Sequence, residues 1–146
     1  MAMASGLYVV TFRDAVNDAT PITMNLTSAS AKVDLYTDTK TPNFDTDAAY
    51  SSTNELPTAG GYTQNSKTVG GSPTCALGNA GQLKYTWSTT VSWTSASFTA
   101  RGMILHTVTD NFPFCAVTFG SDFTATNGTF TITAHANGIF FIDLVP

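Results

Sequence analysis

Short runs that alternate apolar and polar residues, separated by Gly, Pro and Asn, recur along the whole chain and constrain the fold most strongly. An alternation with a period of two is typical of strands with one buried face. This pattern predicts strands at residues 7–12, 21–26, 32–37, 82–88, 91–93, 97–108, 114–119, 129–135 and 139–145. Helical periodicity is almost absent, which favours an all-β protein, either an antiparallel β-sandwich or a barrel-like fold with long loops and at most short helical turns.

The 146 residues correspond to about one domain. Residues 1–30 are expected to form an N-terminal arm with the first strands, which could dock on a partner, and residues 31–146 the β-sandwich. Short helical turns fit residues 12–18 and 45–50, and residues 50–81 are predicted to be an extended loop with one or two short strands. Because the first residues lack a basic region before their apolar run, no signal peptide is expected.

The sequence also predicts details of two strands. Met103–Leu105 is apolar on both faces, which indicates a central strand that is covered on each side. The last two predicted strands fit a hairpin with a three-residue loop, Ala136 to Gly138, and a positive φ at Gly138. Its core face would hold Phe130, Ile132 and Ala134 opposite Leu144, Ile142 and Phe140. Its other face, where partner contact is expected, would combine Thr129, Thr131, Thr133 and His135 with Ile139, Phe141 and Asp143.

Composition limits the functions that fit the chain. Only 11% of residues are charged, against roughly 25% in an ordinary soluble domain, and 26 Thr and 12 Ser take their place. A threonine-rich surface with few charges suits contact with another protein, although an ordinary secreted β domain fits the composition equally well. The net charge is −4 and there are two arginines, so nucleic-acid binding is not expected. The sequence has no run of about 20 apolar residues, so a membrane span is not expected.

Three acidic residues lie close together in the chain, Asp45, Asp47 and Glu55. In a calcium-binding EF-hand loop that starts at Asp45, Tyr50 would replace the required glycine and Leu56 the required glutamate. Two carboxylates in one short loop also do not fit a glycosidase pair, which flanks a bond from opposite sides. We expect Asp45, Thr46 or Asp47 to cap a helical turn, with a weak surface cation site as the alternative.

The remaining reactive residues form no recognised motif. His106 and His135 could be oriented by Asp110 or Asp143, but no nucleophile elbow accompanies them, and His106 is expected to be a satisfied or partly exposed residue of a sheet. Cys75 and Cys115 are expected to be reduced thiols. We therefore predict no catalytic residue, no cofactor and no metal. Six aromatic residues could form a sugar-binding platform or fill the core, and the core is the more common use: Tyr36, Tyr50, Tyr62, Tyr85, Trp87 and Trp93.

Several segments in a fixed order resemble a group of small structural proteins encoded among the head genes of tailed bacteriophages. The resemblance spans Lys32 to Leu144 and follows the segments "KVDLYTDTKTPNFDTDAAY", "NELPTAGGYTQNSKTV", "VSWTSASFTARGMILH", "AVTFGSD" and "NGTFTITAHANGIFFIDL". It implies a capsid decoration, cement or minor capsid protein on the virion surface, assembled in the host bacterial cytoplasm. Its partners would be the major capsid protein and further copies of itself, with a trimer as one form. A tail or connector protein and a carbohydrate- or receptor-binding module on the virion are the alternatives.

Six residues are the candidates for contact with a partner. Leu7, Val9 and Phe12 belong to the apolar N-terminal arm, which could pair with a foreign strand, and Ile139 and Phe141 lie on the threonine face. Arg101 is expected to be either an interface anchor or a residue paired within the sheet, with Asp34 or Asp143 as its partner. Contact with a capsid shell needs only modest affinity for each copy when many copies share it.

Overall fold

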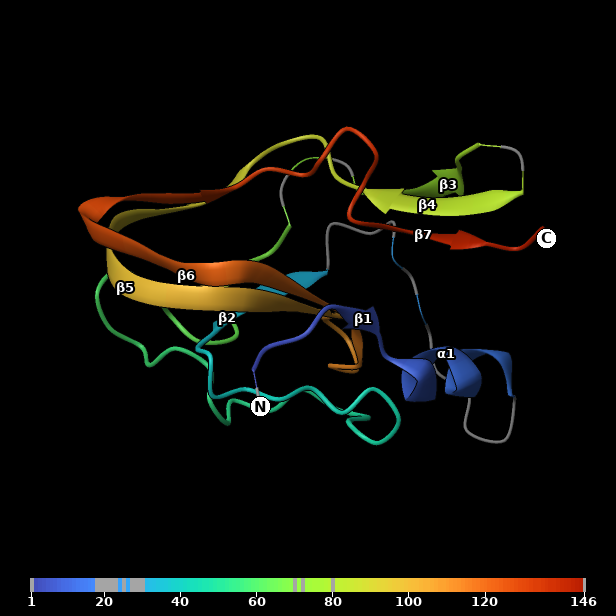
Figure 1. The fold of residues 1–146 in the computed structure, drawn as a ribbon, viewed down its shortest axis with the longest axis horizontal. Coiled ribbons are helices and arrows are strands. Elements are labelled where there is room, and N and C mark those ends of the chain that lie inside the picture. Colours follow the sequence, from blue (N-terminus) through green and yellow to red (C-terminus); the bar gives the residue numbers. More distant parts are fainter. Residues whose placement is uncertain are drawn as a thin grey trace.

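The computed structural model describes residues 2–17, 24, 26, 31–69, 71, 73–79 and 81–145. In this part of the chain two antiparallel sheets and one short helix form a sandwich-like fold, which confirms the predicted class (Figure 1). The four-stranded sheet has the order β1-β6-β5-β2, with β1 at Gly6–Leu7, β6 at Pro113–Ile132, β5 at Val91–His106 and β2 at Lys32–Tyr36. The three-stranded sheet has the order β3-β4-β7, with β3 at Thr74–Leu77, β4 at Gln82–Thr86 and β7 at Phe140–Asp143.

Strands β5 and β6 form one long ribbon that bends back over itself, at the left of Figure 1. Its register shifts between Trp93 and Ala96, between Ala96 and Phe98, and between Ala100 and Gly102. Such bulges bend a strand and increase its twist. The segments predicted as separate strands, 91–93 with 97–108 and 114–119 with 129–135, are therefore parts of two continuous strands that reach from one layer to the other.

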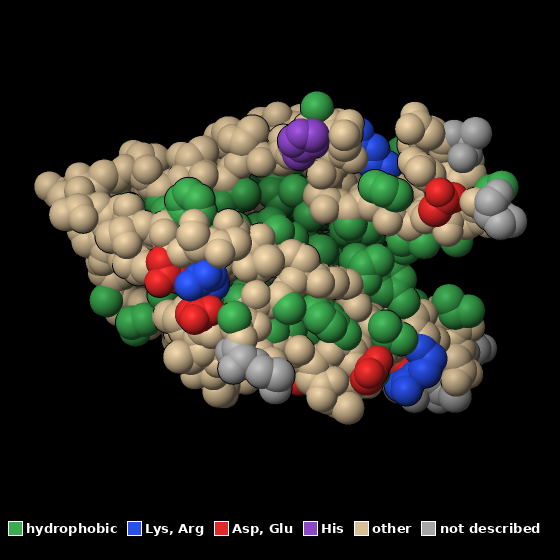
Figure 2. Space-filling view, in the orientation of Figure 1, with side chains coloured by type: hydrophobic (Ala, Val, Ile, Leu, Met, Phe, Trp, Pro, Cys, Tyr) green, Lys and Arg blue, Asp and Glu red, His purple; other side chains and the backbone are tan. Residues whose placement is uncertain are grey.

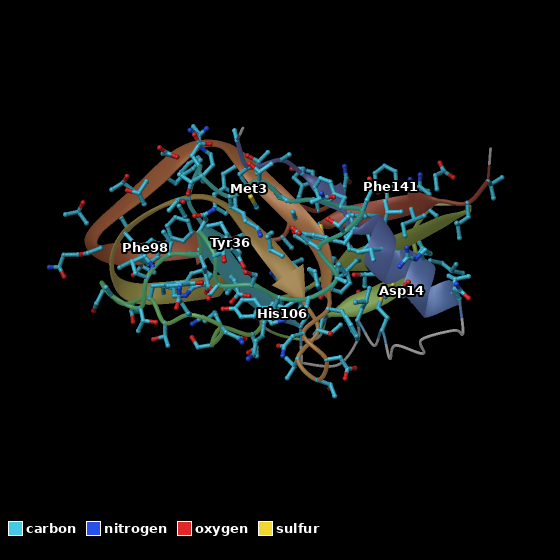
Figure 3. All side chains as sticks on the ribbon, turned by 90° about the horizontal axis from the view of Figure 1, so that it is seen from below. Met3, Asp14, Tyr36, Phe98, His106 and Phe141 are labelled. Atoms are coloured by element: carbon cyan, nitrogen blue, oxygen red, sulfur yellow. The ribbon has the colours of Figure 1, made fainter. Side chains whose placement is uncertain are left out.

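The four-stranded sheet is covered on both faces, as predicted for Met103–Leu105. Met103 and Leu105 point into the main core, whereas Ile104 between them belongs to a second apolar cluster on the opposite face. The N-terminal segment and the loop after β2 cover that opposite face, and Figure 3 shows Met3, Tyr36 and His106 on this side of the sheet. The main core lies between the two layers and includes both tryptophans.

The predicted strand at 7–12 is wrong beyond Leu7, because Val9–Val16 forms helix α1. Tertiary contacts override the β propensity of the valines. The amide of Tyr8 still donates to the carbonyl of Phe114, but the Thr11 hydroxyl then donates to the Pro113 carbonyl at 2.5 Å and holds the first helical turn against β6. Residues 2–17 thus pack on the chain's own sheet. The strand predicted at 21–26 falls mostly outside the described residues, and its described positions, 24 and 26, are not in a strand.

The turn of the last predicted hairpin is confirmed, but the pairing of its strands is wrong. Gly138 has φ +92°, and its amide donates to the His135 carbonyl at 2.8 Å. Strand β6 nevertheless pairs with β5, and β7 pairs with β4 in the other sheet. The positive φ redirects the chain from one sheet to the other, where Phe140 stacks on Tyr85. The faces of β6 are as predicted, with Ile132 buried and its threonines outside, whereas Leu144 is exposed.

Candidate protein-docking groove

A groove of about 250 Å³ lies between the two sheets, where an edge strand of each sheet borders it. Strand β1 pairs only with β6, and β7 pairs only with β4, so within the described residues each has a strand neighbour on one side alone. Unpaired backbone groups of an edge strand can accept another strand. The residues that line the groove are Ser5, Gly6, Leu7, Cys115, Ala116, Val117, Ile139 and Phe140.

The floor of the groove is built on the core. The Phe140 ring stacks on Tyr85 at 5.4 Å between centroids and lies edge-on to Phe12 of α1 at 6.4 Å. Leu7 is the register partner of Cys115, and the Ile139 amide donates to the Tyr85 carbonyl at 2.9 Å. Figure 2 shows hydrophobic side chains gathered in the hollow between the β3-β4-β7 layer and the region of α1. The groove is therefore apolar and held in shape by packed aromatic rings.

The lining of the groove contains no charged side chain. Burial raises the pKa of the Cys115 thiol to about 12, so it stays protonated at neutral pH. A protonated thiol is a weak nucleophile and a poor metal ligand. The chemistry that the groove offers is apolar contact together with backbone hydrogen bonding.

The structure brings three of the six candidate contact residues together at this groove. Leu7 and Ile139 line it, and Phe12 supports its floor through Phe140. Phe140 itself was not among the candidates, although the predicted core face of the last hairpin included it.

The other three candidates lie elsewhere. Val9 is 56% exposed on α1, and Phe141 is 55% exposed on the opposite face of β7, beside a second hollow that Leu77 and Lys84 also line. The guanidinium of Arg101 donates to Asp122 Oδ1 at 2.8 Å and to the Gly120 carbonyl at 3.0 Å, and lies 3.6 Å from Asp38. Arg101 is thus paired within its own chain, but the predicted partners Asp34 and Asp143 are wrong.

Asp34 instead pairs with His106 in the interior. Both side chains are fully buried, and His106 Nε2 lies 2.7 Å from Asp34 Oδ2 while Nδ1 lies 2.9 Å from the Thr107 carbonyl. The ring of Tyr50 lies over the imidazole with 4.9 Å between centroids. The carboxyl group beside His106 is therefore that of Asp34, and not of Asp110 or Asp143, the orienting residues considered from the sequence. His135 is exposed, and its Nδ1 accepts a hydrogen bond from the Asn137 amide at 3.1 Å.

The acidic loop shapes the backbone, but not through the predicted helical turn. Asp47 Oδ2 accepts from the Asn43 amide at 3.0 Å and lies 3.7 Å from Lys40 Nζ, which closes a turn at residues 43–47. No helix forms at 45–50, because the Tyr50 amide donates to the carbonyl of Asn111 at 2.7 Å and draws the chain toward the β5–β6 turn. The Asp45 carboxylate makes no cap there; its amide donates to Asn43 Oδ1.

Glu55 has a role that the sequence did not predict. Its carboxylate accepts hydrogen bonds from the hydroxyl groups of Tyr50 and Tyr62 and from the Asn65 amide. Tyr62 in turn accepts from the Leu35 amide at 2.9 Å, so Glu55 fastens the long loop to β2. Burial raises the pKa of the Glu55 carboxyl above its ordinary value, and the hydrogen bonds offset part of the rise.

The aromatic residues considered as a sugar platform are mostly core residues. Trp87 and Trp93 are each 4% exposed, and of the six only Tyr50 is partly exposed. The other members are fully enclosed: Tyr36, Tyr62 and Tyr85. These residues therefore present no joint stacking surface to a ligand.

Among the described residues, no three His, Cys, Asp or Glu side chains gather as metal ligands would. The same part of the chain has no helix with the length and hydropathy to cross a membrane. No protein-family model, curated protein or solved structure matches this chain.

Proposed function

We propose that this protein is a bacteriophage virion structural protein that binds the outer surface of the head and stabilises it by bridging neighbouring major capsid subunits. The apolar groove between β1 and β7 supports this proposal most directly. Two open strand edges and an uncharged lining fit an extended segment of another protein, which would add main-chain hydrogen bonds to either edge. The order of segments that resembles small phage head proteins supplies the identity of the partner.

The surface composition supports the same proposal. With 11% charged residues, the protein opposes close approach by a neighbour only weakly. On a shell each copy meets the same repeating surface, so many modest contacts add up when copies also touch one another. A decoration protein therefore needs no single tight site, which agrees with a groove of only about 250 Å³.

The proposal is tested by adding purified protein to head shells that lack it and measuring how much sediments with them. Wild type is expected to bind in a saturable manner, and Ile139→Asp is expected to bind at least tenfold more weakly, since it puts a carboxylate into the apolar groove. Phe141→Asp is the matched control, because Phe141 is exposed and faces the side of β7 opposite to Phe140, which lines the groove. Circular dichroism melting verifies that each variant folds.

Equal binding by wild type and Ile139→Asp would remove the groove from the proposal. Binding to purified tails in place of heads would favour a tail or connector protein. Binding to glycans with no affinity for shells would favour a receptor-binding module.

A further inference from the structure

The outer edge of β6 has no strand neighbour over most of its length within the described residues. Strand β1 pairs with β6 only at Cys115 and Ala116, while β5 pairs along the other side as far as Ile132. From Phe123 to Ile132 the outer edge is therefore open, with one irregularity at Asn127, where φ is +46° and the register with β5 shifts. After this irregularity, the N–H and C=O groups of the edge can accept a further strand.

A groove of about 570 Å³ runs beside this open edge, at the end of the molecule opposite Phe141, near Phe98 in Figure 3. Its apolar part is a chain of aromatic rings, in which Phe119 lies 6.0 Å from Phe123 and 6.2 Å from Phe130 between centroids. Phe123 is 50% exposed. A strand added to the edge of β6 would place its inward-facing side chains against these rings.

The edge has none of the charges that commonly protect exposed strands. No Asp, Glu, Lys or Arg occurs between Asp122 and Asp143, which leaves residues 123–142 without a charged side chain. Soluble proteins usually protect a free edge with Lys, Pro or inward-pointing charges. A neutral edge of this length, on a chain of net charge −4, lets a second copy approach without like charges meeting along the contact.

The sequence of the edge is complementary to itself. Residues 128–134 read Gly-Thr-Phe-Thr-Ile-Thr-Ala. When two copies run antiparallel about a two-fold axis at Thr131, Phe130 lies opposite Ile132 of the other copy, and Thr129 lies opposite its Thr133, the first residue after β6. Aromatic with β-branched pairs and Thr with Thr pairs both stabilise adjacent strands. The two-fold axis keeps Phe130 and Ile132 of both copies on the inner face and the threonines on the outer face.

We propose that the protein forms a symmetric dimer in which the outer edges of two β6 strands pair antiparallel about Thr131, so that the four-stranded sheets of both copies become continuous. A two-fold contact uses the same patch on both copies, as this self-complementary segment requires. The dimer covers the aromatic groove beside β6 and leaves the groove between β1 and β7 free. It does not depend on the proposed binding to a capsid shell.

The test uses two variants with opposite charges at Thr131, the residue that lies opposite Thr131 of the other copy in the proposed dimer. Thr131→Lys and Thr131→Asp each place two like charges directly opposite one another, which destabilises a strand pair. Light scattering coupled to size exclusion is expected to give twice the chain mass for wild type and the mass of one chain for either variant alone. An equimolar mixture of the two variants is expected to regain the double mass, since Lys then lies opposite Asp. Thr94→Lys, exposed on β5 away from the edge, is the control and is expected to remain a dimer.

A second measurement does not depend on the variants. Hydrogen exchange of wild type is expected to show amides within residues 128–134 that become protected as the concentration rises through the dimerisation range. A monomeric or trimeric wild type, a Thr131→Lys protein that stays dimeric, or no concentration-dependent protection in residues 128–134 would overturn the proposal.

Discussion

At the scale of single residues, buried polar groups hold the long loop between β2 and β3 in place. Glu55 accepts hydrogen bonds from two tyrosine hydroxyls, and Asp34 pairs with His106 nearby. Burial in combination with the hydrogen bond to Glu55 raises the pKa of Tyr50, so its hydroxyl remains a donor at any physiological pH. These residues stabilise the fold through interactions that do not need solvent access.

Glu55 is expected to make stability depend on pH. Its carboxyl has a pKa in the folded state above the ordinary glutamate value, so between these two pKa values the folded state binds more protons than the unfolded state. The free energy of unfolding therefore falls as pH rises through this window and levels off above the folded-state pKa. Glu55→Gln is expected to flatten this fall, as measured by urea unfolding at a series of pH values. An unchanged pH profile in Glu55→Gln would contradict this assignment.

The Asp34–His106 pair is expected to show strong coupling. His106→Ala leaves the fully buried Asp34 side chain without its partner, which costs about 1–3 kcal/mol. Asp34→Ala in the same background removes that buried polar group, so the double variant should be less destabilised than the sum of the single variants. A double-mutant cycle from urea unfolding measures the difference. Additive losses would show that the two side chains do not interact.

At the scale of elements, the long bent ribbon of β5 and β6 organises both layers. Gly102 lies at one of its register shifts, where an added Cβ would come within 2.6 Å of the Val117 carbonyl oxygen. Because this neighbour is backbone, Gly102→Ala is expected to lower the free energy of unfolding by about 1–3 kcal/mol. Gly128→Ala is the control, since its Cβ would meet nothing closer than 3.8 Å. If the two variants melt at the same temperature, an added Cβ at Gly102 is not crowded by the Val117 carbonyl oxygen, which would contradict this prediction.

The sequence was sufficient to predict which faces are buried but not which strands pair. Alternation placed Ile132 inside and Thr131 outside correctly, because the period of two depends only on the local chain. Gly138 was predicted correctly for the same reason, since its turn is local. The pairing of β7 with β4 depends on Tyr85 and Phe140, which lie 55 residues apart, and no local pattern indicates such a contact.

The candidate site was predictable to a similar degree. Leu7 suggested partner contact because it belongs to the apolar N-terminal arm, and Ile139 because it is an apolar residue on the predicted threonine face. The sequence did not indicate that both residues line one groove, because this depends on how the two sheets are arranged in space. The helical turn predicted at residues 12–18 matches only the later part of helix α1. Its first turn was predicted as strand because Val9 and Val10 favour strands by propensity, and the contacts of Val10 and Thr11 with distant carbonyl groups explain the helix there.

At the scale of the whole molecule, the uncharged groove between β1 and β7 and the low content of charged residues support the proposed contact with a capsid shell. Because no charged side chain lines the groove, its association with a shell is expected to depend weakly on salt, with less than a threefold change in affinity between 50 and 500 mM NaCl, since screening acts on charges. Sedimentation binding at several salt concentrations measures this. A steep fall with salt would indicate that charged residues outside the groove dominate.

The central claim is the proposed binding to the outer surface of the phage head. The number and position of copies in a particle test this claim most directly. Quantitative electron microscopy of virions that contain the protein is expected to show hundreds of copies on the outer surface of the head, with the groove between β1 and β7 against the major capsid protein. A handful of copies confined to the tail, or particles whose heads bind none, would contradict it.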